Sequence, residues 1–572
     1  MPVFLPDADP DPAAREAERA EARATYRYTW HRPEGVATAA EVPKSDGFSA
    51  GYLAKFGAAS VKLKAHRVAV STQNRVANAE ADAAGKGLFA RVAGAVEGVI
   101  GSEGSERRAT PEVAIRWYGD DVPAYVQQRA DHPEQSDLLF AWERLGGCNP
   151  MALRAIAALP DGLALPGARF AEALAVGGAT DALDAALADG RVFLADWSSL
   201  AGSPTGTTAK GLAKHLFGAR ALFVQVKGGP FLPVAIQCEP DGPALTPADG
   251  DAWTIAKLVA QCADAHEQAL TWHLAHCHFL MEAFTLATMR ELAKAHPLRR
   301  LLAAHMEFTL SINAQVRDTL MKPEGDLEKL LSMTRGQSLV MVSEAMSAFD
   351  YAAVVPPANV AARGLGDAAT LPQCPLREDG LDFWGAIHGF VSEYVGLYYA
   401  TDAAVAEDAE LRAWADDLRS HWGGRLETIP TPSDRATLAE LVSFVLWTAG
   451  PFHTICNYSQ DEYMGDSSSM PTALYAGAPG PAATAADLYA QYTPEDLSLD
   501  QYAFFWEQTQ LRESEFGKYP PGTFDDPRVA PLTAAFAAAL EAVDARIVER
   551  NAARPAAYEW LRPSQTRGSI HS

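Results

Sequence analysis

The sequence predicts a mainly α-helical protein with a small β element in its first half. From about residue 250 onward, apolar residues recur at helical spacing over long stretches separated by turn signals. Two earlier runs, "RVFLADW" at 191–197 and "ALFVQVKGGPFLPVAIQCE" at 221–239, are rich in β-branched and aromatic residues, which favours strands. The first hundred residues carry no strand-like alternation, so a β-sandwich domain is not expected there.

The individual elements follow in chain order. Residues 11–30 and about 50–100 are expected to be helical, and the turn-rich run "GSEGSERRATPE" occupies 101–112. The strands of 221–239 form a pair that turns at a Gly-Gly-Pro sequence. One helix of more than 40 residues is expected from 251 until Pro297 stops it. Further helices are predicted at 300–320, 334–350, 380–403, 434–458, 486–515 and 530–551.

Composition narrows the function classes. The formal charge of −24 argues against binding to nucleic acid or strong binding to anionic membranes. No run of 18 or more apolar residues occurs, so no transmembrane segment is expected. The acidic first residues lack the basic and apolar regions of a secretory signal, which predicts a cytoplasmic protein. Six scattered cysteines form no disulfide framework and fit a reducing compartment.

The stretch "TWHLAHCHFLMEAF" at 271–284 places three histidines, His273, His276 and His278, on an apolar helix. On an ideal α-helix His273 and His278 point about 140° apart, so only a π-type turn would let them share a ligand. His273 and His276, three residues apart, would share a face without special geometry. Spacing alone leaves both pairings open.

Three interpretations of these histidines compete. They are core residues satisfied by hydrogen bonds, ligands of a hydrolytic zinc, or ligands of a redox-active iron or manganese. The zinc interpretation is weakened because the His-Glu-x-x-His pattern is absent. A second apolar helix, "LVSFVLWTAGPFHTICNYSQDEY" at 441–463, favours a metal, since His453 and Asn457 lie four residues apart on one face. Cys277 and Cys456 are interpreted as small packing residues.

Together these segments resemble the lipoxygenase family over most of the chain. Residues 272–305 are similar to its signature, in which two histidines separated by four residues precede a His-Pro-x-x-(Lys/Arg)-Leu-Leu-x-x-His run, here "HPLRRLLAAH". Other matching segments are "FAWERLGGCNP" (140–150), "AWTIAK" (252–257), "REDGLDFWGAIHGFVSEYVGLYY" (377–399), "MPTALY" (470–475) and the closing run 549–572.

The resemblance implies roles for individual residues. The metal ligands would be His273, His278, His453, Asn457 and the main-chain carboxylate of Ser572. Around them, the residues expected to hydrogen-bond or orient the ligands are Glu282, Gln460 and Gln268. The walls of the substrate and oxygen pocket would include Val316, Leu320 and Phe284, whereas His276 is an extra histidine and His296 and His305 are framework residues.

The sequence departs from the family pattern at two positions. Ser572 stands where the family has a terminal isoleucine, so the carboxylate is kept while the apolar anchor is lost, and His571 is a competing ligand beside it. Val316 stands where the family usually has alanine or glycine, which narrows the expected oxygen pocket. The resemblance also implies a bacterial-type domain division, with 1–115 as a helical extension over the pocket and 116–572 as the catalytic domain.

The activity implied by the resemblance is that of a dioxygenase. One non-haem iron per chain, cycling between Fe2+ and Fe3+, would carry a hydroxide that takes hydrogen from the 1,4-pentadiene of a fatty acid, so no side-chain base is needed. The expected partners are a C18–C20 polyunsaturated fatty acid and O2, without nucleic acid, and transient membrane contact stays open. The alternatives are a hydroperoxide isomerase, a manganese-dependent variant, or a decayed lipid-binding protein.

Overall fold

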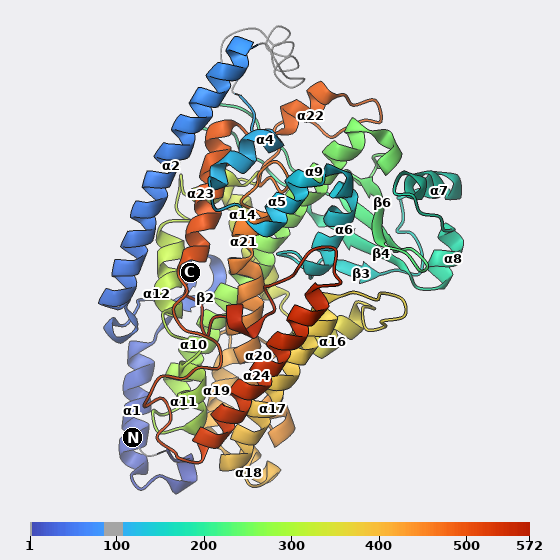
Figure 1. Cartoon of the computed structure of the whole chain (residues 1–572). Helices are drawn as coiled ribbons and strands as arrows, with labels where there is room; N and C mark the ends of the chain where they lie inside the picture. Colours follow the sequence, from blue (N-terminus) through green and yellow to red (C-terminus); the bar gives the residue numbers. More distant parts are fainter. Residues whose placement is uncertain (1–2, 85–106, 572) are drawn as a thin grey trace.

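Helices make up most of the structure, a computed structural model that describes residues 3–84 and 107–571 (Figure 1). The mainly α fold class predicted from the sequence is confirmed. Ser572 and the predicted turn-rich residues 101–106 lie outside the described residues, as do residues 85–100. A large cluster of buried apolar side chains extends from Val36 in the first hairpin to Ile570 near the end of the chain, so the helical elements share one core.

The β element is an antiparallel sheet with strand order β3-β4-β5-β6-β7. It lies at the right of Figure 1, where α7 and α8 cover its outer side. Alternation along β4 sends Phe193 and Ala195 into the main core and Val192 and Leu194 into a smaller core under these helices. The strands are Leu153–Ala155, Val192–Asp196, Arg220–Gln225, Phe231–Gln237 and Ala244–Leu245, and the two covering helices are Gly167–Val176 and Leu183–Ala188.

The N-terminal extension is not wholly helical, which corrects the prediction for residues 11–30 and for 1–115. Helix α1 (Pro12–Thr25) ends early, and an antiparallel hairpin of β1 (Tyr28–His31) and β2 (Glu34–Ala39) follows. The aromatic and β-branched residues of β1 suit a strand, but the hairpin is fixed by tertiary contacts. The amide of Ala39 donates to Glu282 Oε1 at 2.7 Å, which ties β2 to the helix that carries Glu282.

Helix α2 (Ala50–Ala84) runs along one edge of the molecule and packs against α23 (Glu495–Gln510) (Figure 1). At its beginning, Tyr52 Oη donates to the carbonyl of His571 at 2.6 Å. The extension therefore holds the C-terminal segment, next to the position where the resemblance places a metal ligand.

The long helix predicted from 251 is present and continuous to Glu291. It consists of α9 (Asp251–Glu267), a π-helical segment Gln268–Phe279 and α10 (Leu280–Glu291). A second interrupted helix crosses the core and consists of α20 (Arg435–Trp447), the π-helical segments Thr448–Phe452 and Thr454–Tyr458, and α21 (Gln460–Tyr463). These two interrupted helices contact each other through their π-helical segments.

The second of these helices, Arg435–Tyr463, is the one helix among the described residues that is long and apolar enough to span a membrane. However, 94% of its most apolar window is buried inside the protein. That burial is what a central core helix requires, because its apolar residues face other helices on all sides.

Two predicted helices are broken. The stretch 300–320 divides into α11 and α12 because Phe308 takes a left-handed backbone conformation between them. The stretch 486–515 divides at Pro494, which precedes α23. The remaining helices are α4 (Pro111–Ala114), α5 (Ala124–Asp131), α6 (Ser136–Gly146), α11 (Pro297–Ala303), α12 (Thr309–Asp318), α13 (Asp326–Leu330), α14 (Arg335–Ser347), α15 (Tyr351–Val354), α16 (Pro356–Ala362), α17 (Leu381–Tyr398), α18 (Asp402–Glu407), α19 (Ala409–Arg419), α22 (Ala485–Gln491) and α24 (Val529–Asn551).

Candidate metal centre

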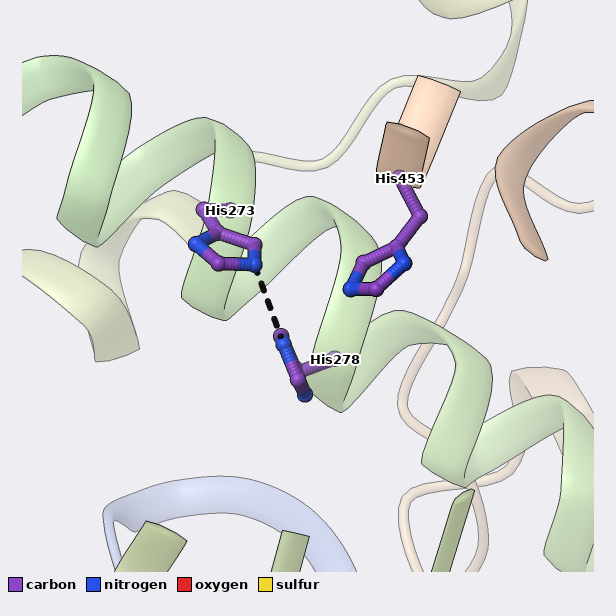
Figure 2. Close-up of side chains that lie close together, drawn as sticks. All are labelled: His273, His278 and His453. Carbon is purple, nitrogen blue, oxygen red and sulfur yellow. Dashed lines mark hydrogen bonds between the residues drawn. The ribbon is translucent and has the colours of Figure 1, made fainter. Parts of the chain in front are cut away.

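The π-helical segment Gln268–Phe279 brings His273 and His278 to the same side of the long helix. Their Nε2 atoms are 3.2 Å apart, and Figure 2 shows the two rings facing each other across one turn. A π turn has the i→i+5 repeat that this spacing needs, so the structure selects this pair. His276 belongs elsewhere, because its Nε2 lies 3.1 Å from the carbonyl of Ala345 and its ring packs edge-on against Trp272.

His453 completes the cluster from the second interrupted helix (Figure 2). One ring nitrogen from each of His273, His278 and His453 lies within 4.8 Å of the other two. Pro451 lacks an amide hydrogen, which suits the π-helical interruption just before His453. Gly450 is needed at this place because a Cβ there would lie 2.4 Å from the ring of Phe516.

The environment keeps the imidazoles of His273 and His278 neutral. Burial lowers the pKa of His278 to about 4, against the opposing effect of its hydrogen bond to Asn313. Burial, helped by the neighbouring His278, lowers the pKa of His273 well below its usual value. Neutral imidazole is the form that offers a lone pair to a metal ion, so near pH 7 no proton has to be removed first.

Asn313 on α12 orients His278, and this residue was missed in the sequence. Its Oδ1 lies 2.8 Å from His278 Nδ1, and its Nδ2 donates to the carbonyl of His278 at 2.7 Å. The Nδ1–H of His278 thus has a partner, which leaves Nε2 with the lone pair that faces the cluster. The sequence shows only an asparagine on a mixed helix, which is too common to point to this role, and its full burial appears only in the structure.

Glu282 lies behind Asn313, one step away from the histidines. Its Oε2 accepts from Asn313 Nδ2 at 2.9 Å and pairs with Arg317 Nη1 at 2.7 Å. The side chain of Glu282 is fully buried, so this pairing is what makes its charge tolerable. Glu282 therefore orients Asn313, which in turn orients His278.

Gln460 and Gln268 connect the two helices at His273. Gln460 Nε2 is 3.3 Å from both His273 Nδ1 and Gln268 Oε1, while Gln268 Nε2 donates to the carbonyl of Cys456 at 2.6 Å. Gln268 is fully buried. Gln460 Oε1 has no hydrogen-bond partner among the described residues.

The other two expected ligands belong to the second helix and to the C-terminus. Asn457 is buried one turn after His453, and its Nδ2 donates to the carbonyl of Gln508 at 3.0 Å. Ser572 lies outside the described residues. His571 does not join the cluster, because its Nε2 lies 3.3 Å from Ser514 Oγ and its ring contacts Phe308.

His296 and the two cysteines next to the cluster, Cys277 and Cys456, have structural roles. His296 caps the beginning of α11 by accepting from the amide of Leu298, and its Nε2 lies 3.2 Å from Asp408 Oδ2. Both cysteines next to the cluster are buried, and burial raises the pKa of the Cys456 thiol well above its usual value. A neutral thiol is a poor metal ligand, in agreement with the packing interpretation.

An apolar cavity of about 60 Å³ adjoins His273 and His278. Val316 and Leu320, two of the predicted pocket walls, line it. Phe284, the third, does not line this cavity; it is fully buried with its ring centroid 6.0 Å from that of Trp414. Other lining residues include Leu270, Leu274, Leu327, Leu330, Leu331, Phe504 and Phe505.

The cavity is small for a lipid site. Sites for ligands of that size usually have volumes of about 300–1,000 Å³. Side chains around the 60 Å³ cavity must therefore move before an acyl chain can lie next to the histidines. Within the described part of the chain, no residue before 116 lines it, so the role of the extension as a lid stays a prediction.

The fold and the site together define a large helical protein with a buried cluster of three histidines between two interrupted helices. Comparison with known proteins identifies it further. A sequence model described as Lipoxygenase matches residues 114–503, and the chain belongs to the lipoxygenase family.

Relatives and solved structures agree with this family. The chain is 32% identical over 463 residues to the linoleate 9/13-lipoxygenase of Pseudomonas aeruginosa, covering 76% of this chain and 67% of that protein. It is 30% identical over 446 residues to the human hydroperoxide isomerase ALOXE3, covering 76% of this chain but only 62% of that protein, less than two thirds of its length.

Structural similarity extends over the whole chain. A coral 8R-lipoxygenase matches with a TM-score of 0.85 at 20% identity, covering all of this chain and 83% of that one. A manganese lipoxygenase matches with a TM-score of 0.77 at 23% identity, covering 100% of both chains. At these identities the two structures support the fold.

Proposed function

We propose that this protein is a metal-dependent fatty-acid dioxygenase, which inserts O2 into the cis,cis-1,4-pentadiene of a polyunsaturated fatty acid to give a hydroperoxide. The observation that carries the proposal is the buried cluster of three imidazoles, two of which, His273 and His278, line an apolar cavity. Membership of the lipoxygenase family and the similarity to a bacterial linoleate lipoxygenase support the same reaction.

The donor set fits an iron or manganese ion better than a softer metal. Three imidazole nitrogens converge from His273, His278 and His453, and no described thiolate joins them. Asn457 and the terminal carboxylate of Ser572 would add oxygen donors. Iron is the proposed metal and manganese the alternative, and the ion would supply the one-electron oxidation that accompanies removal of hydrogen from the bis-allylic carbon.

The protein's own groups position the reactants and the ligands. Asn313 fixes the ring orientation of His278, so that its Nε2 lone pair is directed before the metal arrives, and Gln460 contacts the ring of His273. The walls made by Leu270, Leu274 and Leu320 exclude water from the reacting carbon. Each buried methylene of the acyl chain contributes about 0.8 kcal/mol, so a C18–C20 chain can be held mainly by apolar contact.

Val316 is the residue expected to set where oxygen meets the substrate. It lines the cavity together with His273 and His278, in the position where the family usually has a smaller residue. Its two extra carbon atoms relative to alanine reduce the space beside the pentadiene, and regiochemistry is therefore expected to respond to this residue.

Purified protein analysed for metal and then given linoleate in oxygenated buffer tests the proposal. We expect close to one iron or manganese per chain and a rise in the ultraviolet absorbance of conjugated diene, matched by O2 uptake. His453→Ala should lose both, whereas His421→Ala, an exposed histidine that is absent from the cluster, should retain both. Bound zinc, or diene formation independent of His453, would overturn the proposal.

Hydroperoxide isomerisation is the second candidate. Two observations favour it, namely the similarity to the human hydroperoxide isomerase and the restricted space at Val316. Adding a fatty-acid hydroperoxide in place of the fatty acid distinguishes the two reactions, because an isomerase consumes it without taking up O2.

A further inference from the structure

A buried lysine lies behind the wall of the apolar cavity that adjoins the candidate metal centre. Lys214 is only 2% exposed, and its Nζ donates hydrogen bonds to three main-chain carbonyls. They belong to Glu328, Lys329 and Leu331, at 3.0, 2.7 and 2.9 Å. An ammonium has three hydrogens to donate, so each of them has an acceptor. Lys214 is therefore fully committed to one short stretch of backbone.

These carbonyls lie at the end of α13, where a helix leaves its last carbonyls without partners inside the helix. The amides of Ser332 and Met333, which would extend the helix, are directed elsewhere: His266 Nε2 lies 3.1 and 3.4 Å from them. Lysine side chains can bond the last carbonyls of a helix, and Lys214 does so here. The ammonium thus fixes the end of α13.

The side chains of the same stretch form part of the cavity wall. Leu327, Leu330 and Leu331 line the cavity together with the two histidines of the first interrupted helix. Lys214 is not among the described residues that line it, so it acts on the cavity through the backbone that it holds. Because the cavity measures about 60 Å³, a small displacement of this wall changes a large share of the space beside the histidines.

The segment that carries Lys214 is itself held in place. Its amide donates to the carbonyl of Gly206 at 3.0 Å, and the amide of His215 donates to the carbonyl of Leu474 at 2.8 Å. Ser332 Oγ donates to the carbonyl of His215 at 2.6 Å, just beyond α13. The ammonium therefore extends from a fixed base, so it restrains α13 rather than moving with it.

Lys214 carries its charge near pH 7. Burial lowers the pKa of its ammonium to about 8, and the carboxylate of Glu328 acts in the opposite direction. The titratable groups beside it are neutral, since burial lowers the pKa of His266 to about 4 and raises that of Cys262 to about 12. Hydrogen bonds from a charged donor are stronger than those from a neutral one, so the three carbonyls are held firmly.

We propose that Lys214 is a positioning residue for the acyl chain of the substrate. By holding the end of α13, it sets how far Leu327, Leu330 and Leu331 extend into the cavity, and thereby which carbon of the chain lies next to the metal centre. A retracted wall lets the chain lie deeper, so that O2 meets a different carbon of the pentadiene. This inference rests on the proposed function, because it takes the cavity for the fatty-acid site.

Lys214→Met tests the proposal, because it keeps the length of the side chain and removes the donors. In the full, metal-loaded chain we expect hydrogen exchange of the amides in 326–333, measured by mass spectrometry, to become about tenfold faster. With linoleate, KM should rise about threefold at a nearly unchanged kcat per bound metal, and the ratio of positional hydroperoxide isomers should shift about twofold or more. A general weakening of the fold would lower metal content and kcat as well.

Lys210→Met is the matched control. Lys210 belongs to the same segment as Lys214, but its Nζ pairs with Asp496 at 3.0 Å and not with α13. Hydrogen exchange in 326–333, KM and the isomer ratio should all equal those of the unmodified chain. If thermal unfolding shows that Lys214→Met does not fold, Lys214→Gln, which keeps two donors, takes its place and should show the same changes at smaller size.

Two results overturn the proposal. One is unchanged hydrogen exchange in 326–333, and the other is faster exchange without any change in KM and isomer ratio, which would leave Lys214 a structural role alone. If the unmodified chain forms no conjugated diene, the proposed function itself fails. The dissociation constant for linoleate, measured without O2, then replaces KM, and an equal constant in Lys214→Met overturns the positioning role.

Discussion

Two sets of buried histidines can be compared in this protein, the cluster at the candidate metal centre and the framework histidines, represented by His266 and His305. All are buried, and burial lowers the pKa of His266, His278 and His305 alike to about 4. Neither burial nor a lowered pKa therefore identifies a metal ligand in this protein.

The difference lies in the second ring nitrogen. In His266, Nδ1 lies 2.8 Å from the carbonyl of Cys262 and Nε2 accepts from the amide of Ser332 at 3.1 Å. In His305, Nδ1 lies 2.7 Å from the carbonyl of Gly568 and Nε2 3.2 Å from Tyr519 Oη. His278 instead has Asn313 on one nitrogen and another histidine on the other. A buried imidazole whose second nitrogen faces other imidazoles is the pattern that indicates a metal.

Replacing one histidine of each set by alanine, His278 from the cluster and His266 from the framework, tests the comparison with the largest expected effect. His278→Ala should lower metal content to background and activity by at least about 1,000-fold, with a small change in the stability of the metal-free protein. His266→Ala should do the reverse: metal per folded molecule stays near the original value while the free energy of unfolding falls by about 2–4 kcal/mol, because two hydrogen-bonded groups lose a buried partner. Metal analysis and urea unfolding check both variants, and equal metal loss in the two would contradict the comparison.

Asn313→Ala tests the group that orients His278. Loss of its contact at 2.8 Å leaves the tautomer of His278 unfixed, and we expect metal affinity or activity to fall by about 10–100-fold. Ser311→Ala, on the same helix but bonded to the carbonyl of Asp46, is the matched control and should change activity little. Unchanged metal affinity in Asn313→Ala would show that Asn313 serves the fold alone.

Acid should destabilise the framework through His266. In the folded protein the pKa of His266 is about 4, below the ordinary value of 6.5. Its contribution to the free energy of unfolding is therefore fully present above pH 6.5 and is lost as the pH falls towards 4. At pH 5 this one residue is expected to have lost about 2 kcal/mol. Unfolding of metal-free protein between pH 7 and pH 5 measures the loss, and His266→Gln should show a shallower dependence. An identical slope in the variant would exclude His266 as its source.

Val316→Ala should have the smallest effect of the four. The substitution removes two carbon atoms from a half-buried side chain, so the free energy of unfolding should fall by about 1 kcal/mol or less. The enlarged space should raise the rate with linoleate a few-fold and shift the position of oxygenation, as measured by product chromatography. An unchanged product ratio would mean that other walls, such as Phe504 and Phe505, define the oxygen path.

Much of the site was predictable from the sequence because the spacing of the histidines constrains the geometry. A separation of five residues in an apolar helix permits a shared ligand only with a π turn, and the structure has that turn between His273 and His278. The helices and the strand pair at 221–239 were likewise predictable, because the spacing of their apolar residues matches the period of each element.

The parts that sequence reasoning missed depend on tertiary contacts. The hairpin at 28–39 is fixed by its bond to Glu282, and Asn313 is recognisable only once α12 is placed against His278. The sequence placed Phe284 among the candidate pocket walls, whereas its ring lies near Trp414, because periodicity shows that a helix face is buried without showing which element covers it.

Anomalous diffraction from crystals of the metal-loaded protein, recorded at the iron and manganese absorption edges, tests the central claim most directly. We predict one strong peak at a single edge, enclosed by the imidazole nitrogens of His273, His278 and His453. A peak located elsewhere, or none in protein that contains metal by chemical analysis, would contradict the claim that these three histidines form a metal centre.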